Sequence, residues 1–154
     1  MEGTSGKVVF KTYNQRQPTL FPPSLDSLIP DGHLVRLVDS AIEQIDLSPI
    51  LDSYKGGGTS SYHPKMLLKV LVYAYSQKIY TSRQIAKAIG ENIHFMWLCG
   101  GNKPDFRTIN RFRTSRLRNN TEKIFASMLE LMAEAKLINL EEYFLDGTKI
   151  EANA

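Results

Sequence analysis

The sequence contains one cysteine, three histidines and no long apolar run, and each scarcity excludes a class of protein. Cys99 has no second cysteine with which to form an internal disulfide. His33, His63 and His94 are far apart in the sequence and lack metal-ligand spacing, so we interpret each as a structural or surface residue. No apolar stretch approaches the roughly 20 residues that span a bilayer. The N-terminus also lacks the apolar run of a signal peptide, so we expect a cytoplasmic protein without a membrane partner.

Charge is present in ordinary amounts, but its distribution is uneven. The chain has 154 residues, of which 42% are hydrophobic and 23% charged, a composition typical of a globular domain. Its net charge is +3, yet residues 81–118 hold eight lysines and arginines against two acids, which is +6 for that segment. The remainder, with eleven basic and fourteen acidic residues, carries −3. Such asymmetry favours a polyanionic partner bound by one face of the molecule.

The first part of the chain, residues 1–32, is polar and then rich in proline, which predicts an extended arm. We expect four apolar side chains to hold this arm to the rest of the protein: Leu20, Phe21, Leu25 and Ile29. Residues 33–138 follow as a predicted helical domain.

The helical domain begins with apolar residues at helical spacing, for which Asp31 is available as the N-cap. A serine and a proline at positions 48 and 49 then predict a short helix to about Tyr54. The next helix starts at Pro64 and is apolar nearly all round to Lys78, so we expect it at the centre of the fold. The apolar stripe of the first helix consists of Leu34, Leu37, Val38, Ala41, Ile42 and Ile45.

Two short helices are predicted at the start of the basic segment. Thr81 and Gln84 form a capping-box pattern, in which each side chain satisfies an N–H group of the first turn, for a helix over 82–90. A second helix is predicted over 93–99, where the glycines at positions 100 and 101 end it.

Helical signals continue beyond a connecting loop. Asp105 is the predicted cap of a helix that reaches about Leu117, and Asn119 or Asn120 begins a further helix. Only after Asn139 does the pattern become strand-like. The predicted fold class is therefore mainly α: a compact multi-helix bundle with a helix-turn-helix-like unit, followed by one terminal β-strand.

The helix that starts at Asp105 presents a basic face. At α-helical spacing, arginine, asparagine and threonine side chains fall on one side of it. Guanidinium groups bind phosphate or guanine in a bidentate fashion and asparagine pairs with adenine, so these residue types are typical of DNA recognition. The candidate DNA ligands within residues 103–118 are Lys103, Arg107, Asn110, Arg111, Arg113, Thr114, Arg116 and Arg118.

In an alternative interpretation, the basic face does not bind nucleic acid. Charged helix faces are often simply solvated, or their arginines form ion pairs with acids elsewhere in the protein, and the pattern alone leaves both interpretations open. Phe106, Ile109 and Leu117 lie away from the basic face and are able to dock inward.

Asp146 stands between Leu145 and Ile150 in an apolar, strand-like run. An unpaired carboxylate buried there would cost several kcal/mol of desolvation, unless it meets a cation or hydrogen-bond donors. Asp146 therefore either begins a metal site or caps a turn.

Several stretches of the chain, taken together and in order, resemble one family. They resemble the N-terminal helical domain of bacterial insertion-sequence transposases of the DDE type, joined to the first strand of the RNase H-like catalytic domain. The likeness covers nearly the whole chain after about residue 12. Its segments are residues 14–17, 20–36, 62–71, 82–86, 104–113 and 145–154.

The resemblance implies a role for Asp146 as the first aspartate of an Asp-Asp-Glu triad and a metal ligand. In the complete catalytic domain, two Mg²⁺ ions about 4 Å apart activate water or a DNA 3′-hydroxyl for attack on a phosphodiester. No second aspartate or glutamate of that triad is matched up to Ala154. We therefore expect residues 139–154 to be one strand of an incomplete domain, with no Mg²⁺ bound and no DNA cleavage by this chain alone.

The resemblance and the charge pattern lead to one principal hypothesis and two alternatives. The principal hypothesis is the N-terminal portion of a DDE transposase, which binds double-stranded DNA at transposon ends during DNA transposition and is therefore associated with the nucleoid. A non-catalytic regulator would occupy the same ends, or pair with full-length transposase or with another copy of itself, and inhibit transposition. A helical protein-interaction module would have no nucleic-acid role.

Overall fold

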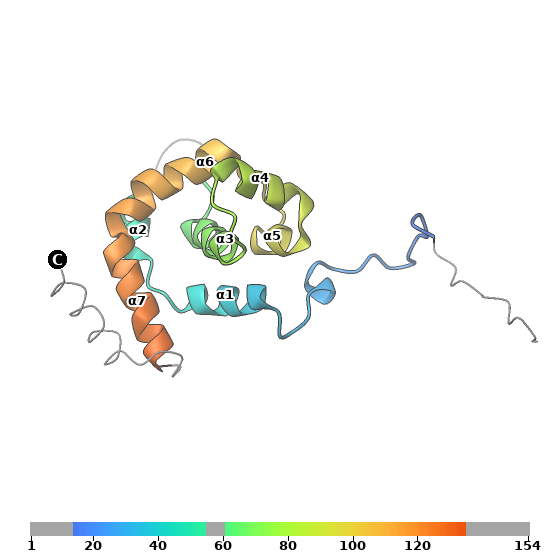
Figure 1. Ribbon diagram of the computed structural model, residues 1–154, viewed down its shortest axis with the longest axis horizontal. Helices are drawn as coiled ribbons and strands as arrows, with labels where there is room; N and C mark the ends of the chain where they lie inside the picture. The colour runs from blue at the N-terminus through green and yellow to red at the C-terminus, as the bar shows by residue number, and fades with distance from the viewer. Residues whose placement is uncertain (1–13, 55–60, 135–154) are drawn as a thin grey trace, which may run out of the picture.

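Helix α3 (Pro64–Ser76) forms the centre of the fold, as its nearly all-round apolar sequence predicts. Pro64 occupies the first turn, and the Nδ1 atom of His63 accepts a hydrogen bond from the Lys65 N–H at 3.1 Å, so the helix begins where proline permits it. In the computed structural model, helices α1, α4 and α5 pack around α3 (Figure 1). The buried residues of α3 are Pro64, Leu67, Leu68, Val70, Leu71, Tyr73 and Ala74.

The structure describes residues 14–54 and 61–134, and this part of the chain is mainly helical with no β-strand. The predicted terminal strand over 139–154, with Asp146, lies outside the described residues. No helix in the described ranges is both long enough and apolar enough to cross a membrane.

Helix α1 (Leu34–Glu43) begins two residues later than a cap at Asp31 would give. His33, rather than Asp31, is the N-cap, because its extended backbone lets Nδ1 accept a hydrogen bond from the Val35 N–H at 3.2 Å. The predicted stripe was also partly wrong, since Leu34 and Leu37 are 41% and 58% exposed. Val38, Ile42 and Ile45 of the stripe are buried, as predicted, and packing against α3 buries Val35 as well.

Two short helices start at their predicted signals, although the first of them ends at Leu51 and not at about Tyr54. Helix α2 (Ser48–Leu51) has its proline in the first turn, and α4 (Ser82–Glu91) is capped by Thr81, whose hydroxyl accepts a hydrogen bond from the Gln84 N–H at 3.2 Å. The Gln84 side chain accepts a hydrogen bond from the Thr81 hydroxyl instead of reaching the Thr81 N–H, so the capping box is only half formed.

Helix α5 (Ile93–Leu98) ends at two glycines, as predicted. Gly100 and Gly101 have φ angles of +54° and +80°, a left-handed conformation in which a side chain is strained. The chain can therefore turn sharply after α5 and enter the loop that leads to the next helix.

The last part of the described chain is one bent helical path, where a break at Asn119 or Asn120 was predicted (Figure 1). Asn120, one of the two asparagines expected to start a new helix, bonds to the preceding turn: its Nδ2 donates to the Arg116 carbonyl at 3.0 Å. The Thr121 hydroxyl likewise donates to the Leu117 carbonyl at 2.9 Å. The path consists of α6 (Phe106–Arg111), the π-helical turn η2 (Phe112–Leu117), the 3₁₀ turn η3 (Arg118–Asn120) and α7 (Thr121–Glu134).

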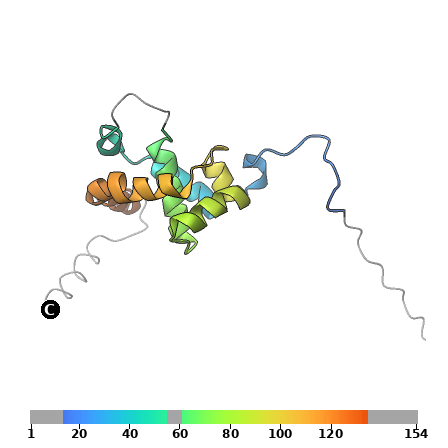
Figure 2. The ribbon, with the colours of Figure 1, turned by 90° about the horizontal axis from the view of Figure 1, so that it is seen from above.

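In both views, residues 14–25 of the N-terminal arm extend away from the helices (Figures 1 and 2). Leu20 and Phe21 are 90% and 82% exposed, so the prediction that they pin the arm was wrong. Ile29 is buried, as predicted, just after the 3₁₀ turn η1 (Asp26–Leu28). The apolar anchor of the arm therefore lies at its end, beside α1.

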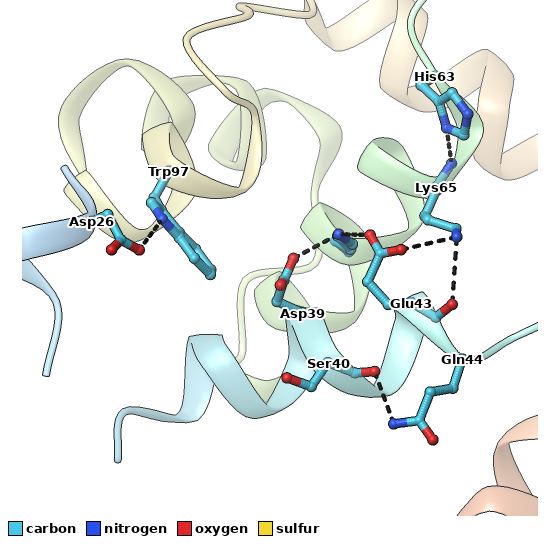
Figure 3. Close-up of polar contacts among 9 residues, drawn as sticks. Asp26, Asp39, Ser40, Glu43, Gln44, His63, Lys65 and Trp97 are labelled. Carbon is cyan, nitrogen blue, oxygen red and sulfur yellow. Dashed lines mark hydrogen bonds and ion pairs between the residues drawn. The ribbon is translucent and has the colours of Figure 1, made fainter. Parts of the chain in front are cut away.

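Polar contacts complete the anchor of the arm. The Arg36 guanidinium binds the Asp26 carboxylate at 2.9 Å and donates to the carbonyls of Asp26 and Ile29 at 2.8 and 2.9 Å. The indole N–H of Trp97, on α5, donates to the same carboxylate at 3.1 Å (Figure 3). Asp26 thus joins the arm to α1 and α5.

Ion pairs join α1 to α3. Lys69 binds Asp39 at 2.6 Å and also Glu43, and Lys65 binds Glu43 at 3.0 Å (Figure 3). Hydrogen bonds from Lys69 and then Lys65 lower the pKa of Glu43 from its usual value. These acids are therefore already paired within the scaffold.

Candidate nucleic-acid interface

A cleft of about 620 Å³ lies where α6 packs against α4. Four arginines line it, Arg83 from α4 and Arg107, Arg111 and Arg113 from α6 and η2, and none of the residues that line it is a carboxylate. A concave surface with one sign of charge concentrates anions, so this cleft is the best candidate site in the described part of the chain.

Asp105 explains why α6 carries its polar side chains toward the cleft. Its carboxylate accepts a hydrogen bond from the Thr108 N–H at 2.7 Å, which starts the helix, and Ile109 is then buried in the core. Arg107, Asn110 and Arg111, on the other side of the helix, are exposed, as predicted. Hydrogen bonds with Thr108, followed by the charges of Arg107 and Arg111, lower the pKa of Asp105.

Phe106 lies at the cleft and is 36% exposed, whereas Ile109 is buried and Leu117 packs against the core. The guanidinium of Arg83 lies 5.1 Å from the centroid of the Phe106 ring, and that of Arg107 lies 5.6 Å from it. The ring therefore holds two cations at the mouth of the cleft.

Arg113 lines the cleft and is held by two hydrogen bonds within the protein. One guanidinium nitrogen donates to the Tyr80 carbonyl at 2.8 Å, and the other donates to the Asn110 side-chain oxygen at 3.2 Å. Arg113 therefore ties η2 to the turn before α4 and orients the Asn110 amide at the same time.

Arg116 is held by contacts within the protein. It donates to the carbonyl of Ser53 and, at 2.7 Å, to the Ser53 hydroxyl, while its guanidinium lies 4.2 Å from the centroid of the Tyr54 ring. A second, smaller cleft of about 290 Å³ is lined by Tyr54, Arg111 and Arg116 among other residues.

The remaining three candidate ligands are dispersed. Thr114 lines the larger cleft, and its hydroxyl donates to the Asn110 carbonyl at 2.9 Å. Lys103 is exposed in the loop between α5 and α6, and Arg118 is exposed on η3, away from the residues that line the cleft. The predicted alignment of Arg118 with Arg107 requires an α-helix throughout, whereas a π-helical turn and the start of a 3₁₀ turn lie on the path between them.

Two residues of the cleft were missed by reasoning from the sequence. Arg83 was counted in the basic segment, but helical phase within 105–117 could not place a residue of another helix beside Phe106. Ser82 gave no signal, because a serine in a first helical turn is ordinary; only the structure shows it buried at the cleft.

The basic segment is not neutralised by acids within the described ranges. The ion pairs seen there join Arg36, Lys65 and Lys69 to acids, and none involves a basic residue of 81–118. The described residues also contain no group of three or more histidine, cysteine or acidic side chains able to hold a metal ion. The sequence left two alternatives to DNA binding for the basic face: ion pairs with acids, or a face that is simply solvated. Ion pairs of this kind are not observed among the described residues, so a solvated face is the remaining alternative.

The described residues form a small helical domain with an arginine-lined cleft in which no lining residue is a carboxylate. The family model of the transposase domain DUF772 matches residues 23–115, which is more than half of the chain and includes all residues that line the larger cleft. The chain therefore belongs to this transposase domain family. No curated protein and no solved structure matches the chain.

Proposed function

We propose that this chain is the N-terminal portion of a DDE-type transposase and binds double-stranded DNA at transposon ends through the cleft between α4 and α6. The observation that carries the proposal is the set of four arginines around a cleft without a carboxylate, none of them ion-paired within the described residues. Membership of a transposase domain family supports the same function.

The two exposed arginines of α6 supply the principal contacts. Arg107 and Arg111 are one helical turn apart, with Asn110 between them, so both guanidinium groups reach the same stretch of DNA backbone or the adjacent groove. Each neutralised phosphate releases counterions, so affinity must fall as salt rises. Lys103 and Arg118 are exposed outside the cleft and are proposed to add further phosphate contacts, whereas Arg116 is engaged by Ser53 and Tyr54.

The catalytic part of the proposal concerns Asp146, which lies outside the described residues. Asp146 is proposed as the first acid of the triad and as a ligand of Mg²⁺ in a complete catalytic domain. Because Mg²⁺ needs near-octahedral oxygen coordination, other acids must join it, from further residues of a longer chain or from another chain. The 154-residue polypeptide by itself is expected to bind DNA without nicking it.

One observation favours a second function, a protein-interaction module. Leu20 and Phe21 are almost fully exposed on the extended arm, and neighbouring exposed apolar side chains are common at protein contacts. Through such a contact, the chain would pair with another copy of itself or with a full-length transposase. A non-catalytic regulator of transposition would use the same contact.

A salt titration of DNA binding tests the proposed function. The duplex is taken from the DNA on either side of the coding sequence, and binding is measured by fluorescence anisotropy. For wild type, the logarithm of the association constant should fall linearly with the logarithm of salt concentration, by about 0.9 per phosphate contact. Arg107→Ala/Arg111→Ala should lower affinity and reduce the slope by about 1.8, which corresponds to two lost contacts.

Lys123→Ala provides the matched control, since Lys123 is an exposed cation on α7 outside the cleft. Its salt slope should equal that of wild type. Equal affinities and slopes for wild type and Arg107→Ala/Arg111→Ala would contradict the proposed function.

A further inference from the structure

Ser82 presents a buried hydroxyl without a partner. It is the first residue of α4, is 8% exposed, and lines the arginine cleft. Its Oγ atom makes no hydrogen bond to any described residue. Buried polar atoms almost always have a hydrogen-bond partner, so an unpaired hydroxyl on a residue that lines a cleft points to a ligand as the missing partner.

Two backbone donors lie beside this hydroxyl. At the start of α4, the Gln84 N–H bonds the Thr81 hydroxyl and the Ile85 N–H bonds the Thr81 carbonyl at 3.0 Å. The N–H groups of Ser82 and Arg83 have no acceptor among the described residues. They stand at the positive end of a ten-residue helix, where an anion is stabilised.

The surrounding arginines hold this helix end in place. Arg113 donates to the Tyr80 carbonyl, which fixes the turn that leads into Ser82. The Arg83 guanidinium lies against the Phe106 ring at 5.1 Å and so remains at the cleft without an acidic partner in the described ranges. Ser82 and Arg83, which carry the hydroxyl, the two free N–H groups and a guanidinium, are adjacent residues that both line the cleft.

We propose that this end of the cleft binds one phosphate group, with Ser82 as a hydroxyl donor, and that the phosphate belongs to a DNA backbone. A phosphate offers anionic acceptor oxygens for the Ser82 hydroxyl and for the free N–H groups of Ser82 and Arg83. The DNA origin of the phosphate rests on the proposed function, because the cleft adjoins Arg107 and Arg111, the principal DNA contacts in that proposal.

Removing the hydroxyl separates a ligand role from a structural one. Ser82→Ala should weaken DNA binding about tenfold, since a hydrogen bond to a charged group is lost. The thermal midpoint should not fall, because the hydroxyl has no partner in the unbound protein. Ser40→Ala, an exposed serine on α1, should leave both quantities unchanged. Unchanged DNA affinity in Ser82→Ala overturns the site.

Backbone substitution in the DNA identifies the phosphate. Methylphosphonate linkages, which remove the charge of one phosphate at a time, are placed along the same duplex and tested with wild type and Ser82→Ala. One position should weaken wild type strongly and Ser82→Ala little, so the two changes are not additive. Strictly additive effects at every position overturn the site. They leave the proposed function standing if Arg107→Ala/Arg111→Ala still reduces the salt slope.

Inorganic phosphate distinguishes DNA from a small phosphate compound as the source. In an NMR titration, inorganic phosphate should shift the amide signals of Ser82 and Arg83 in wild type, and duplex DNA should displace it. If phosphate shifts these signals and DNA does not displace it, the DNA origin is overturned. If neither ligand shifts them, the whole site is overturned.

Discussion

The guanidinium of Arg116 lies 4.2 Å from the centroid of the Tyr54 ring and donates to the Ser53 hydroxyl at 2.7 Å. The two partners are separated from Arg116 by more than 60 residues of sequence, so the contact ties the bent helical path to the end of α2. Burial raises the pKa of the Tyr54 hydroxyl, although the charge of Arg116 opposes that shift. Arg116 thus links two elements beside the smaller cleft.

Arg116→Ala should lower the free energy of unfolding by about 1–3 kcal/mol, because it removes a cation–π contact and hydrogen bonds from a charged group. Urea unfolding measures this loss. The salt slope of DNA binding should change little, since these contacts engage the guanidinium inside the protein. Arg111→Ala is the matched control and should show the reverse pattern. If Arg116→Ala reduced the salt slope as much as the loss of one phosphate contact would, and left the free energy of unfolding unchanged, a structural role for Arg116 would be refuted.

Asp26→Ala should release the arm from α5 and change the fluorescence of Trp97. Trp97 is the single tryptophan of the chain, its indole N–H bonds the Asp26 carboxylate, and the Arg36 guanidinium lies 5.2 Å from its ring centroid, so its emission reports on the anchor of the arm. The free energy of unfolding should change by less than about 1 kcal/mol, as expected for an exposed ion pair with Arg36. Asp31→Ala, in the same exposed segment, is the control; identical spectra for wild type and Asp26→Ala would refute the prediction.

Two glycines should respond to alanine in opposite directions. Gly101→Ala places a side chain at φ +80° and should destabilise the protein by about 1–2 kcal/mol. Gly90→Ala lies within α4, where an added Cβ meets no atom within 4 Å, and should stabilise it by about 0.5–1 kcal/mol. Thermal midpoints of the two variants provide the comparison, and a shift of the same sign in both would show that backbone conformation does not govern these sites.

His94 should make the protein less stable below neutral pH. Burial, and then the charge of His33, lower the pKa of His94 from its usual value of 6.5. The folded state therefore favours the neutral ring. Below pH 6.5 the unfolded chain binds a proton at His94 more readily than the folded protein does, so the free energy of unfolding falls as the pH decreases.

Urea midpoints between about pH 7.5 and about pH 5.5 measure the effect in the range where histidine titrates. His94→Phe keeps a ring to stack on His33, whose centroid is 4.0 Å away, and removes the titration. The wild-type midpoint should therefore fall more steeply with decreasing pH than that of the variant. Parallel curves would exclude a contribution from His94.

Predictions from the sequence succeeded where a signal acts on adjacent residues. Pro64 starts α3, Asp105 caps α6, and the glycines after α5 adopt positive φ, because a cap, a fixed φ or a missing Cβ acts within one turn. Helical phase also correctly put Ile109 in the core and Arg107 on the surface.

Predictions failed where distant partners decide. Leu37 is exposed and Val35 buried because the position of α3, not the pattern of α1 alone, selects the inward face. Leu20 and Phe21 had no local partner to cover them on the arm. The prediction that Asn119 or Asn120 starts a helix failed for a local reason. The Asn120 side-chain amide donates to the Arg116 carbonyl one turn earlier, and the helical path continues through it.

By itself, the sequence determined a mainly helical domain with a basic segment over 81–118, since composition, caps and helical periodicity depend on neighbouring residues alone. Only the tertiary structure decided which arginines line a cleft and which are bound internally. That outcome depends on Tyr80, Ser53 and Phe106, which come from other parts of the chain. It also revealed the unpaired Ser82 hydroxyl, because burial exists only after the helices have packed.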